Sequence, residues 1–448
     1  MKELTIVLES KGKTPLYEQI YEYLKREMLE GNITPGERLP STRSLAVHLQ
    51  VSRSTIDLAY EQLLAEGYLE SIPCKGYYAC DIRALFQLKT DKVEKKQVQT
   101  PAKPSYAYDF ALNGIDPDGF PMTTWSKISR RILLDDTGKL FQQGEARGEV
   151  GLRQAICDYL YSARGVHCSA EQILVGAGND YLLMILSVLL GRETAIGMEN
   201  PTYTSAYDTF RNLGHPLYPI SMDGDGMQVD ALRQTEANVA YVMPSHQFPT
   251  GVVMPIGRRN ELLSWADEVP GRYIIEDDYD SEFRYKGKPI PALRGMDKAD
   301  RVIYLGTFSK SIAPAIRISY MVLPEELLER QKQRGHFYSQ TVSCVDQKII
   351  EVLLRDGYYE RHLNRMRALY KSKQELLTAE LKKLKQYGTV SGENAGVHIV
   401  FTLKQGCAEK DIIQKAKDCS IRIYGMSDYE IAPSGQSTVG KLLLGYAT

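Results

Sequence analysis

The chain has 448 residues, of which 43% are hydrophobic and 25% are charged, and its formal net charge is −1. This length predicts two or three domains, the composition excludes wholesale disorder, and the charge alone indicates no polyanionic partner. The longest uncharged apolar run, residues 181–190, is too short to cross a bilayer, and the first residues carry no signal-peptide core, so we expect neither secretion nor membrane insertion.

Seven cysteines are spread along the chain without a C-x-x-C pair. An odd number with this spacing favours reduced thiols over a disulfide framework or a zinc site. The sequence therefore predicts a cytoplasmic protein without a metal site.

Three regions differ in their pattern. Residues 1–80 predict a small domain of short helices followed by a hairpin. Residues 81–108 carry six Lys or Arg and breaks at Thr100-Pro101 and Pro104, which is typical of a solvated linker. Residues 109–448 alternate strands and helices, as in an α/β fold with a mostly parallel sheet. We expect this last region to divide into a large domain, about 109–340, and a small subdomain, about 341–448 with part of the N-terminal segment.

The first domain carries the pattern of three helices. Apolar residues recur every four positions from Leu16 to Met28, which predicts a helix that ends before Gly31. Ser41 and Ser52 are placed to cap two further short helices. Apolar positions within both segments recur at helical spacing, so each helix has one face for a core.

A hairpin is predicted directly after the third helix. Residues 68–69 and 77–78 form its two sides, with Lys75 and Gly76 at the tip. Two short helices joined by a tight turn and followed by a hairpin are typical of a winged helix-turn-helix, whose third helix enters the major groove of DNA.

Charge in this domain supports DNA binding only locally. Residues 1–80 contain nine basic and eleven acidic residues, which counts against a nucleic-acid partner. Between Arg38 and Ile56, however, there are three arginines and no carboxylate. Arg53, at the start of the third helix, offers a fork for guanine edges or phosphates. A module that binds a protein partner stays open as an alternative.

Four motifs, at residues 14–17, 35–41, 51–55 and 64–69, resemble the GntR family of bacterial regulators. The resemblance covers residues 14–80. One departure is Asp57, where some members have a second basic residue, so the operator sequence is not predicted. With the two cap serines included, the predicted DNA interface is Ser41, Arg43, Ser52, Arg53, Ser54, Thr55, Lys75 and Gly76.

Polar clusters follow four predicted strands of the second region. Because open α/β sheets bind ligands beyond the carboxyl ends of their strands, these clusters are expected to meet at one site. The strands 173–175, 239–242, 273–275 and 302–305 lead into the polar segments 176–180, 244–246, 276–280 and 306–310.

The side chains in these clusters suit an aldehyde cofactor that carries a phosphate. A glycine-rich turn at 176–178 opens a helix and offers N–H groups to a phosphate, with Ser309 and Arg317 as further donors. Lys310 is able to form a Schiff base with a carbonyl. Asp277 can keep a pyridine nitrogen protonated, which sustains the electron sink of pyridoxal phosphate.

Tyrosines complete this predicted site. Tyr279 can hydrogen-bond the ring oxygen, and Tyr203 is placed to line the ring. The acidic run 276–282 is also compatible with a solvated loop or with a magnesium–phosphate site. The magnesium site would not need Lys310 or Arg317, so we rank it below the pyridoxal site.

The span 109–447 resembles the fold-type I aminotransferases, and the whole chain resembles their MocR/GabR-type regulatory relatives. The motifs that carry this lie at residues 244–251, 276–285 and 306–310. The resemblance implies Lys310 as the Schiff-base lysine, Asp277 at the pyridine nitrogen and Tyr279 at the ring hydroxyl of pyridoxal 5'-phosphate. It further implies a phosphate site made of Ser309, Arg317 and the amides of Gly178, Asn179 and Asp180, and an effector carboxylate site at Arg422.

We therefore predict a regulator that binds DNA through the winged helix and senses pyridoxal phosphate, or an amine or amino-acid effector, through the aminotransferase-like domain. The alternative is an active aminotransferase with a DNA-binding appendage. Phe248 counts against it, because true aminotransferases usually have Asn at that position. The resemblance also implies a head-to-tail, domain-swapped homodimer that reads repeated DNA half-sites.

Overall fold

The computed structural model describes residues 6, 8–9, 14–81, 105–135, 138, 140–285, 287, 290–334, 339–404, 406–433 and 439–448. Contacts divide the chain into two compact units, Met1–Lys103 and Pro104–Thr448, and each is described here by itself. Most of the predicted linker, residues 82–104, lies outside the described residues.

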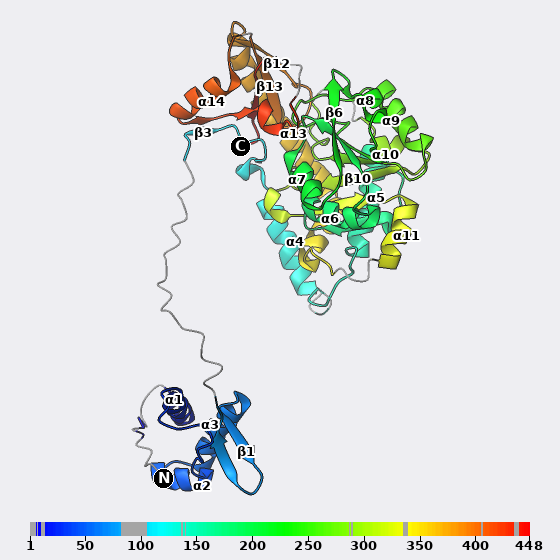
Figure 1. Ribbon diagram of the computed structural model, residues 1–448. Helices are drawn as coiled ribbons and strands as arrows, with labels where there is room; N and C mark the ends of the chain where they lie inside the picture. The colour runs from blue at the N-terminus through cyan, green and yellow to red at the C-terminus, as the bar shows by residue number, and fades with distance from the viewer. Residues whose placement is uncertain are drawn as a thin grey trace. The chain divides into compact units, whose positions relative to one another are not determined.

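The first unit is a winged helix-turn-helix (Figure 1). Its apolar side chains meet in one core, to which all three helices and both strands contribute. The three helices and the hairpin lie where the sequence predicts them. They are α1 (Leu16–Leu29), α2 (Thr42–Leu49), α3 (Arg53–Ala65) and the antiparallel pair β1 (Leu69–Ile72) and β2 (Gly76–Ala79).

Serine caps begin the two short helices, as predicted. Ser41 Oγ accepts a hydrogen bond from the Ser44 amide, and Ser52 Oγ accepts one from the Thr55 amide, both at 3.2 Å. Each bond satisfies a backbone donor that the first turn of a helix leaves without a partner. Gln50 ends α2 in a left-handed conformation, which makes the tight turn toward α3.

The second unit is built on an eight-stranded sheet in the order β4-β11-β10-β9-β8-β5-β6-β7. Strands β10, β9, β8, β5 and β6 pair in parallel, while β11 and β7 are antiparallel to their neighbours, so the sheet is mostly parallel as predicted. The bounds are β4 (Ile173–Gly176), β5 (Ile196–Asn200), β6 (Leu217–Asp223), β7 (Gly226–Met227), β8 (Val239–Val242), β9 (Tyr273–Asp278), β10 (Val302–Thr307) and β11 (Ser319–Val322).

Helices cover both faces of this sheet (Figure 1). Successive strand residues enter different cores: Ile275 of β9 packs in a core with residues of α6 and α7, and Ile274 packs in a core with residues of α8 and α9. This alternation is the period of two that a strand buried on both faces requires. The helices are α4 (Met122–Asp135), α5 (Val150–Arg164), α6 (Asn179–Leu190), α7 (Thr204–Asn212), α8 (Val229–Arg233), α9 (Ile256–Glu268), α10 (Leu293–Met296), α11 (Glu325–Arg334) and α12 (Cys344–Arg355).

A smaller antiparallel sheet belongs to the same unit. Its order is β12-β13-β16-β15, and it shares a core with the long helix α13 (Tyr358–Lys383). Strand β3 (Tyr108–Asp109) pairs in parallel with β14 (Ile421–Arg422), so the start of this unit lies beside a late segment of the chain. The remaining elements are β12 (Gly388–Ser391), β13 (His398–Leu403), α14 (Glu409–Asp418), β15 (Tyr424–Gly425) and β16 (Lys441–Gly445).

Within the described residues, we find no helix whose length and apolar character would let it span a membrane.

Candidate functional site

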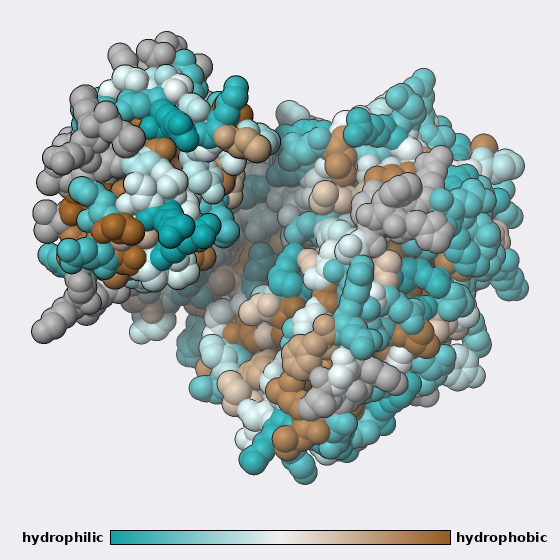
Figure 2. Space-filling view, turned by 90° about the horizontal axis from the view of Figure 1, so that it is seen from below, coloured by the Kyte–Doolittle hydropathy of each residue, from teal (hydrophilic) through white to brown (hydrophobic). Residues whose placement is uncertain are grey.

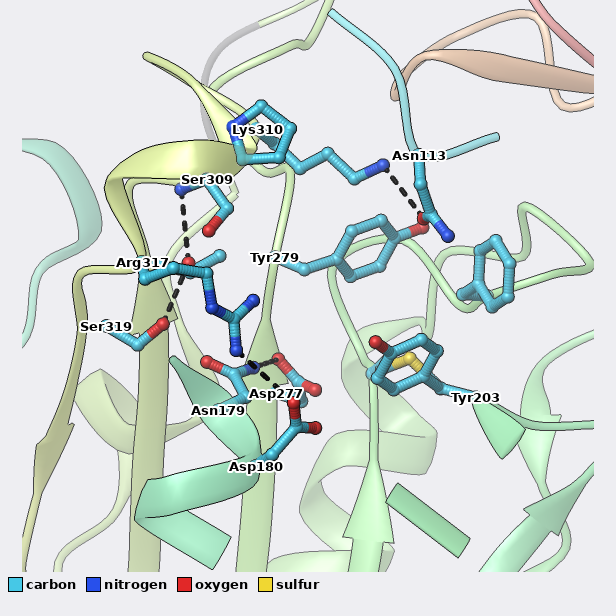
Figure 3. Close-up of a pocket in the computed structure, with 14 residues that line it drawn as sticks. Asn113, Asn179, Asp180, Tyr203, Asp277, Tyr279, Ser309, Lys310, Arg317 and Ser319 are labelled. Atoms are coloured by element: carbon cyan, nitrogen blue, oxygen red, sulfur yellow. Dashed lines mark hydrogen bonds and ion pairs between the residues drawn. The ribbon is translucent and has the colours of Figure 1, made fainter. Parts of the chain in front are cut away.

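A cavity of about 240 Å³ lies at the carboxyl ends of the parallel strands of the large sheet (Figure 3). Eight of the predicted cofactor-binding residues line it, contributed by segments between Asn179 and Arg317. The lining residues are Asn113, Asn179, Asp180, Tyr203, Met243, Phe248, Asp277, Tyr279, Thr307, Ser309, Lys310, Pro314, Arg317 and Ser319.

Lys310 extends into the cavity from the turn after β10. Its Nζ donates hydrogen bonds to the backbone oxygen of Leu112 at 2.6 Å and to Asn113 Oδ1 at 3.2 Å. Burial lowers the pKa of this ammonium group to about 8, against an opposing effect of the Asp280 charge. A fraction of Lys310 is therefore a neutral amine, and hence a nucleophile, near neutral pH.

Asp277 lies on β9, which is longer than predicted. The sequence placed the end of this strand before Glu276, whereas β9 continues to Asp278. Asp277 Oδ1 accepts a hydrogen bond from Asn179 at 3.3 Å, and Oδ2 accepts one from the hydroxyl of Tyr241. Burial raises the pKa of Asp277 to about 7, so this carboxylate is ready to accept a proton or to pair with a cationic ring.

The neighbouring carboxylates, Glu276 and Asp278, point to the other face of the strand from Asp277, where each has a structural partner. Glu276 accepts hydrogen bonds from the amides of Leu293 and Arg294 at 2.7 and 2.8 Å, at the start of α10. Asp278 pairs with the buried Arg164 at 2.8 Å. The acidic run is thus neither a solvated loop nor, among the described residues, part of a cluster of three or more His, Cys, Asp or Glu side chains that could hold a metal ion.

The part of the cavity beside the N-terminus of α6 is suited to a phosphate. The N-terminus of α6 begins at Gly178, which has a φ of 95°, and a Cβ there would lie 2.1 Å from the guanidinium of Arg317. Arg317 itself pairs with Asp180 at 3.3 Å. Free amides at a helix N-terminus beside an arginine form an anion site. Ser309 lies on the other side of Arg317 from Asn179 and Asp180, and its amide donates to Thr307 Oγ1 at 3.1 Å (Figure 3).

One wall of the cavity is aromatic. The Phe248 ring lies edge-to-face against Tyr203 and Tyr279, with centroid distances of 6.0 Å in both cases. It also contacts Tyr429 at 5.0 Å. The position that usually holds Asn in aminotransferases is therefore packed here as part of an apolar wall.

Together these groups fit pyridoxal 5'-phosphate. A lysine amine and a tyrosine hydroxyl lie on one side, a buried carboxylate and the N-terminus of α6 lie on the far side, and Arg317 lies between them (Figure 3). Sequence reasoning placed Thr307 in a polar cluster but gave it no role, and it missed Asn113 and Ser319 in the lining and Tyr241 behind Asp277. Asn113 and Lys310 are 197 residues apart, and no local pattern predicts such a contact.

Arg422 is not among the lining residues of this cavity. It lies on β14, half exposed, where its guanidinium pairs with Asp109 at 3.4 Å and lies over the rings of Tyr106 and Tyr424. Its assignment to an effector carboxylate gains no support from this placement.

The predicted DNA-binding residues lie on the surface of the first unit. Arg53 begins α3 with 69% of its side chain exposed, and its Nε contacts Asp57 at 3.5 Å. The hydroxyl of Ser52 lies 2.8 and 2.7 Å from those of Ser54 and Thr55, so three hydroxyls gather at the N-terminus of α3. Beyond these, Arg43 is exposed on α2, and Lys75 is exposed in the turn between β1 and β2.

Two protein-family models match the two units. Residues 16–78 match the bacterial regulatory proteins of the gntR family, and residues 107–425 match the class I and II aminotransferases. The kynurenine aminotransferase of Pyrococcus horikoshii resembles the structure with a TM-score of 0.66 and 26% identity, over 77% of this chain and 87% of that one.

Full-length relatives carry both units. An uncharacterized HTH-type transcriptional regulator of Bacillus subtilis, YdeL, is 40% identical over 95% of this chain and 92% of its own length. The probable rhizopine catabolism regulatory protein MocR of Rhizobium meliloti is 31% identical over 99% of this chain and 92% of its own. The chain therefore belongs to the MocR-type regulators, in which a winged helix of the GntR family is joined to a domain of the class I and II aminotransferase family.

Proposed function

We propose that this chain regulates transcription by binding DNA through its winged helix and by sensing amines through pyridoxal 5'-phosphate held in the cavity. The observation that carries the proposal is the placement of Lys310, whose amine enters the cavity that Arg317 and the first residues of α6 also line. The similar kynurenine aminotransferase was solved in complex with PMP, which supports the choice of cofactor.

Each residue has a distinct task in this proposal. Arg317, Ser309 and the amides at the start of α6 hold the phosphate, and Asp277 pairs with the ring nitrogen. Tyr279 donates to the ring hydroxyl oxygen, and Tyr203 lines the ring. When bound, the cofactor supplies an aldehyde that condenses with primary amines and a ring that withdraws electrons.

The sensing step is a competition between amines. Lys310 and a free amine or amino acid compete for the same aldehyde. When the free amine wins, Lys310 is released from the cofactor and can return to its hydrogen bonds with Leu112 and Asn113. A ligand of this kind changes DNA binding only if its affinity differs between two conformations of the protein. Pyridoxal phosphate itself is an equally direct signal, because it decides whether Lys310 is free.

On the DNA side, Arg53 and the hydroxyls at the start of α3 contact the major groove, while Lys75 in the wing contacts phosphate. A homodimer would present two such units to repeated half-sites. Exposed apolar side chains of the larger unit support self-association: Met122, Leu134 and Phe141 are 64–73% exposed. Figure 2 shows brown apolar areas among hydrophilic ones on the surface. We place such a protein in the cytoplasm, where its DNA is.

The test is a footprint of the full chain on DNA upstream of its own gene, with and without pyridoxal phosphate and candidate amines. We expect protection of spaced half-sites that changes with the cofactor or an amine. Arg53→Ala should weaken binding by about 1–3 kcal/mol and leave the cofactor's visible absorbance unchanged. Lys310→Ala should abolish both that absorbance and the response to amines, while DNA binding itself persists.

A surface lysine provides the matched control. Lys371→Ala, on the exposed side of α13, should change neither the absorbance nor the response. If Lys310→Ala left both intact, the proposal would be wrong. If no DNA were protected and an amino donor were steadily converted to a keto acid, the chain would instead be an aminotransferase.

A further inference from the structure

A buried polar cluster lies behind Tyr279, outside the lining of the cavity. The hydroxyl of Tyr279 lies 3.0 Å from His246 Nδ1, and the same nitrogen lies 2.9 Å from Asp280 Oδ2. His246 and Asp280 are 2% and 1% exposed. Both follow the carboxyl ends of parallel strands, β8 and β9, so the sheet brings them together as it does the lining residues.

The imidazole of His246 is held tightly in place. A Cβ at Gly396 would lie 2.0 Å from this ring, and one at Gly251 would lie 3.5 Å from its Nε2. The His398 ring is tilted against it at a centroid distance of 5.2 Å. The ring fits only because residue 396 is glycine, and a histidine packed this closely has few alternative orientations.

The hydrogen bonds define which proton each group holds. A carboxylate only accepts hydrogen bonds, so Asp280 holds a proton on His246 Nδ1, and this N–H points toward both Asp280 and the oxygen of Tyr279. The Tyr279 oxygen therefore accepts from His246, while its own proton, which Asp280 also hydrogen-bonds, is the one that the proposed function assigns to the ring oxygen. Burial, together with the charge of Asp280, holds the pKa of Tyr279 well above its usual value, so that proton stays on the hydroxyl.

The aromatic wall formed by Phe248 makes the hydrogen bond donated by Tyr279 important. Phe248 stands in the place where an amide side chain could donate to the ring oxygen of the cofactor, and its ring has no hydrogen-bond donor. Tyr279 must then supply the donated bond, and its orientation decides how well it does so.

We propose that His246, oriented by Asp280, is a positioning residue that directs the hydroxyl of Tyr279 toward the ring oxygen of the cofactor. This rests on the proposed function, in which Tyr279 donates to that oxygen. His246 does not touch the cofactor in this arrangement and acts only through Tyr279.

The experiment follows the visible absorbance of the cofactor-loaded protein as a function of pH. A ring oxygen that loses a donated hydrogen bond becomes more basic and holds the proton it shares with the lysine nitrogen more tightly. We therefore expect His246→Leu to move the midpoint of the spectral transition upward by about one pH unit, in the same direction as Tyr279→Phe. The double variant should shift no further than Tyr279→Phe alone.

Other groups near His246 must be followed in the same titration. Asp280 and Tyr279 face it from the segment after β9, His398 faces it from β13, and the charge of Asp280 also acts on Lys310. Burial lowers the pKa of His398 to about 3, so this ring is neutral throughout the range. Lys310 is common to all the variants, so its titration does not separate them.

Two further variants distinguish position from general packing. His246→Asn keeps an N–H donor near the Nδ1 position and should restore most of the wild-type midpoint. His215→Leu is the matched control, because His215 is also buried but hydrogen-bonds Ser187 and Thr194 away from the cavity. It should leave the midpoint unchanged.

The outcomes separate the two proposals. A shift in Tyr279→Phe without one in His246→Leu would overturn the role of His246 and leave the proposed function standing. No shift in either variant would remove Tyr279 from the ring oxygen, and the proposed function would fail at that residue. Additive shifts in the double variant would show that His246 acts on its own, contrary to the proposal.

Discussion

The pKa values of Lys310 and Asp277 are both shifted toward neutral pH, downward for the lysine and upward for the aspartate. Burial lowers the pKa of the lysine to about 8 and raises that of the aspartate to about 7. In both cases the low dielectric of the cavity disfavours the charged form. In the protein without cofactor, burying these two groups costs free energy. A cationic ring beside Asp277 would offset part of that cost.

The lysine leads to a prediction about pH. Only the neutral amine attacks an aldehyde, so the rate at which the protein captures pyridoxal phosphate should rise with pH and reach half its maximum near pH 8. Stopped-flow absorbance at the visible band, between pH 6.5 and 9.5, measures this rate. A rate that does not change across this range would contradict the lowered pKa of Lys310.

The reactive residues of this site were predictable at the scale of single residues, and their partners were not. Lys310 and Asp277 stand in motifs directly after predicted strands. Lys310, however, donates to the backbone oxygen of Leu112, and every residue carries such an oxygen. A backbone acceptor gives no signal in a sequence, and neither does the contact between Tyr241 and Asp277 across two strands.

Among the elements, β9 is the clearest case of a strand that the sequence predicted too short. Glu276 and Asp278 read as the start of a loop, because carboxylates rarely lie in a buried strand. The structure buries them because remote groups provide partners: the amides of α10 for Glu276, and Arg164 of α5 for Asp278. These partners come from other segments of the chain, so local propensity could not reveal them.

This strand gives a prediction of stability. Asp278→Ala leaves Arg164, which is 4% exposed, without its carboxylate, and should lower the free energy of unfolding by about 3–5 kcal/mol. Urea denaturation monitored by tryptophan fluorescence measures the change. Asp230→Ala, which removes an exposed pair with Arg233, is the control and should cost less than about 1 kcal/mol. Equal costs for the two variants would show that the buried pair contributes nothing special.

Helix α3 gives a prediction about DNA. Asp57 lies one turn after Arg53 and competes with phosphate for its guanidinium. Asp57→Ala should therefore strengthen DNA binding several-fold at low salt, because Arg53 is released and a carboxylate is removed from the groove-facing end. Fluorescence anisotropy over a range of salt concentrations measures this. Glu61→Ala, an exposed carboxylate one turn further along α3, should have a smaller effect; an equal gain would assign the effect to net charge.

At the scale of the whole molecule, each unit has a hydrophobic core of its own. Leu24 is fully buried in the core of the first unit, and Leu186 is fully buried in that of the second. The sequence predicted this division from the change of pattern between the two regions. It could not predict the pairing of β3 with β14, because that parallel pair joins segments separated by more than three hundred residues.

Independent cores predict two unfolding transitions. Leu24→Ala should destabilise only one of them, and Leu186→Ala only the other, each by about 2–5 kcal/mol. Pyridoxal phosphate should raise the midpoint of the transition that Leu186→Ala affects. Differential scanning calorimetry of the full chain measures both effects. A single transition shifted by both variants would show that the two units fold as one.

The hydrogen bond from Lys310 to the Leu112 oxygen links the occupancy of the cavity to the segment at the start of the second unit. Leu112 and Asn113 lie only a few residues after β3, at the start of the second unit, on the side of the chain that leads back to the winged helix. If Lys310 held the cofactor, its nitrogen would have fewer protons to donate, and its hydrogen bonds to Leu112 and Asn113 would weaken. The β3–β14 pair and the hydrogen bond from the Gly445 amide to the Phe110 oxygen would still hold this segment.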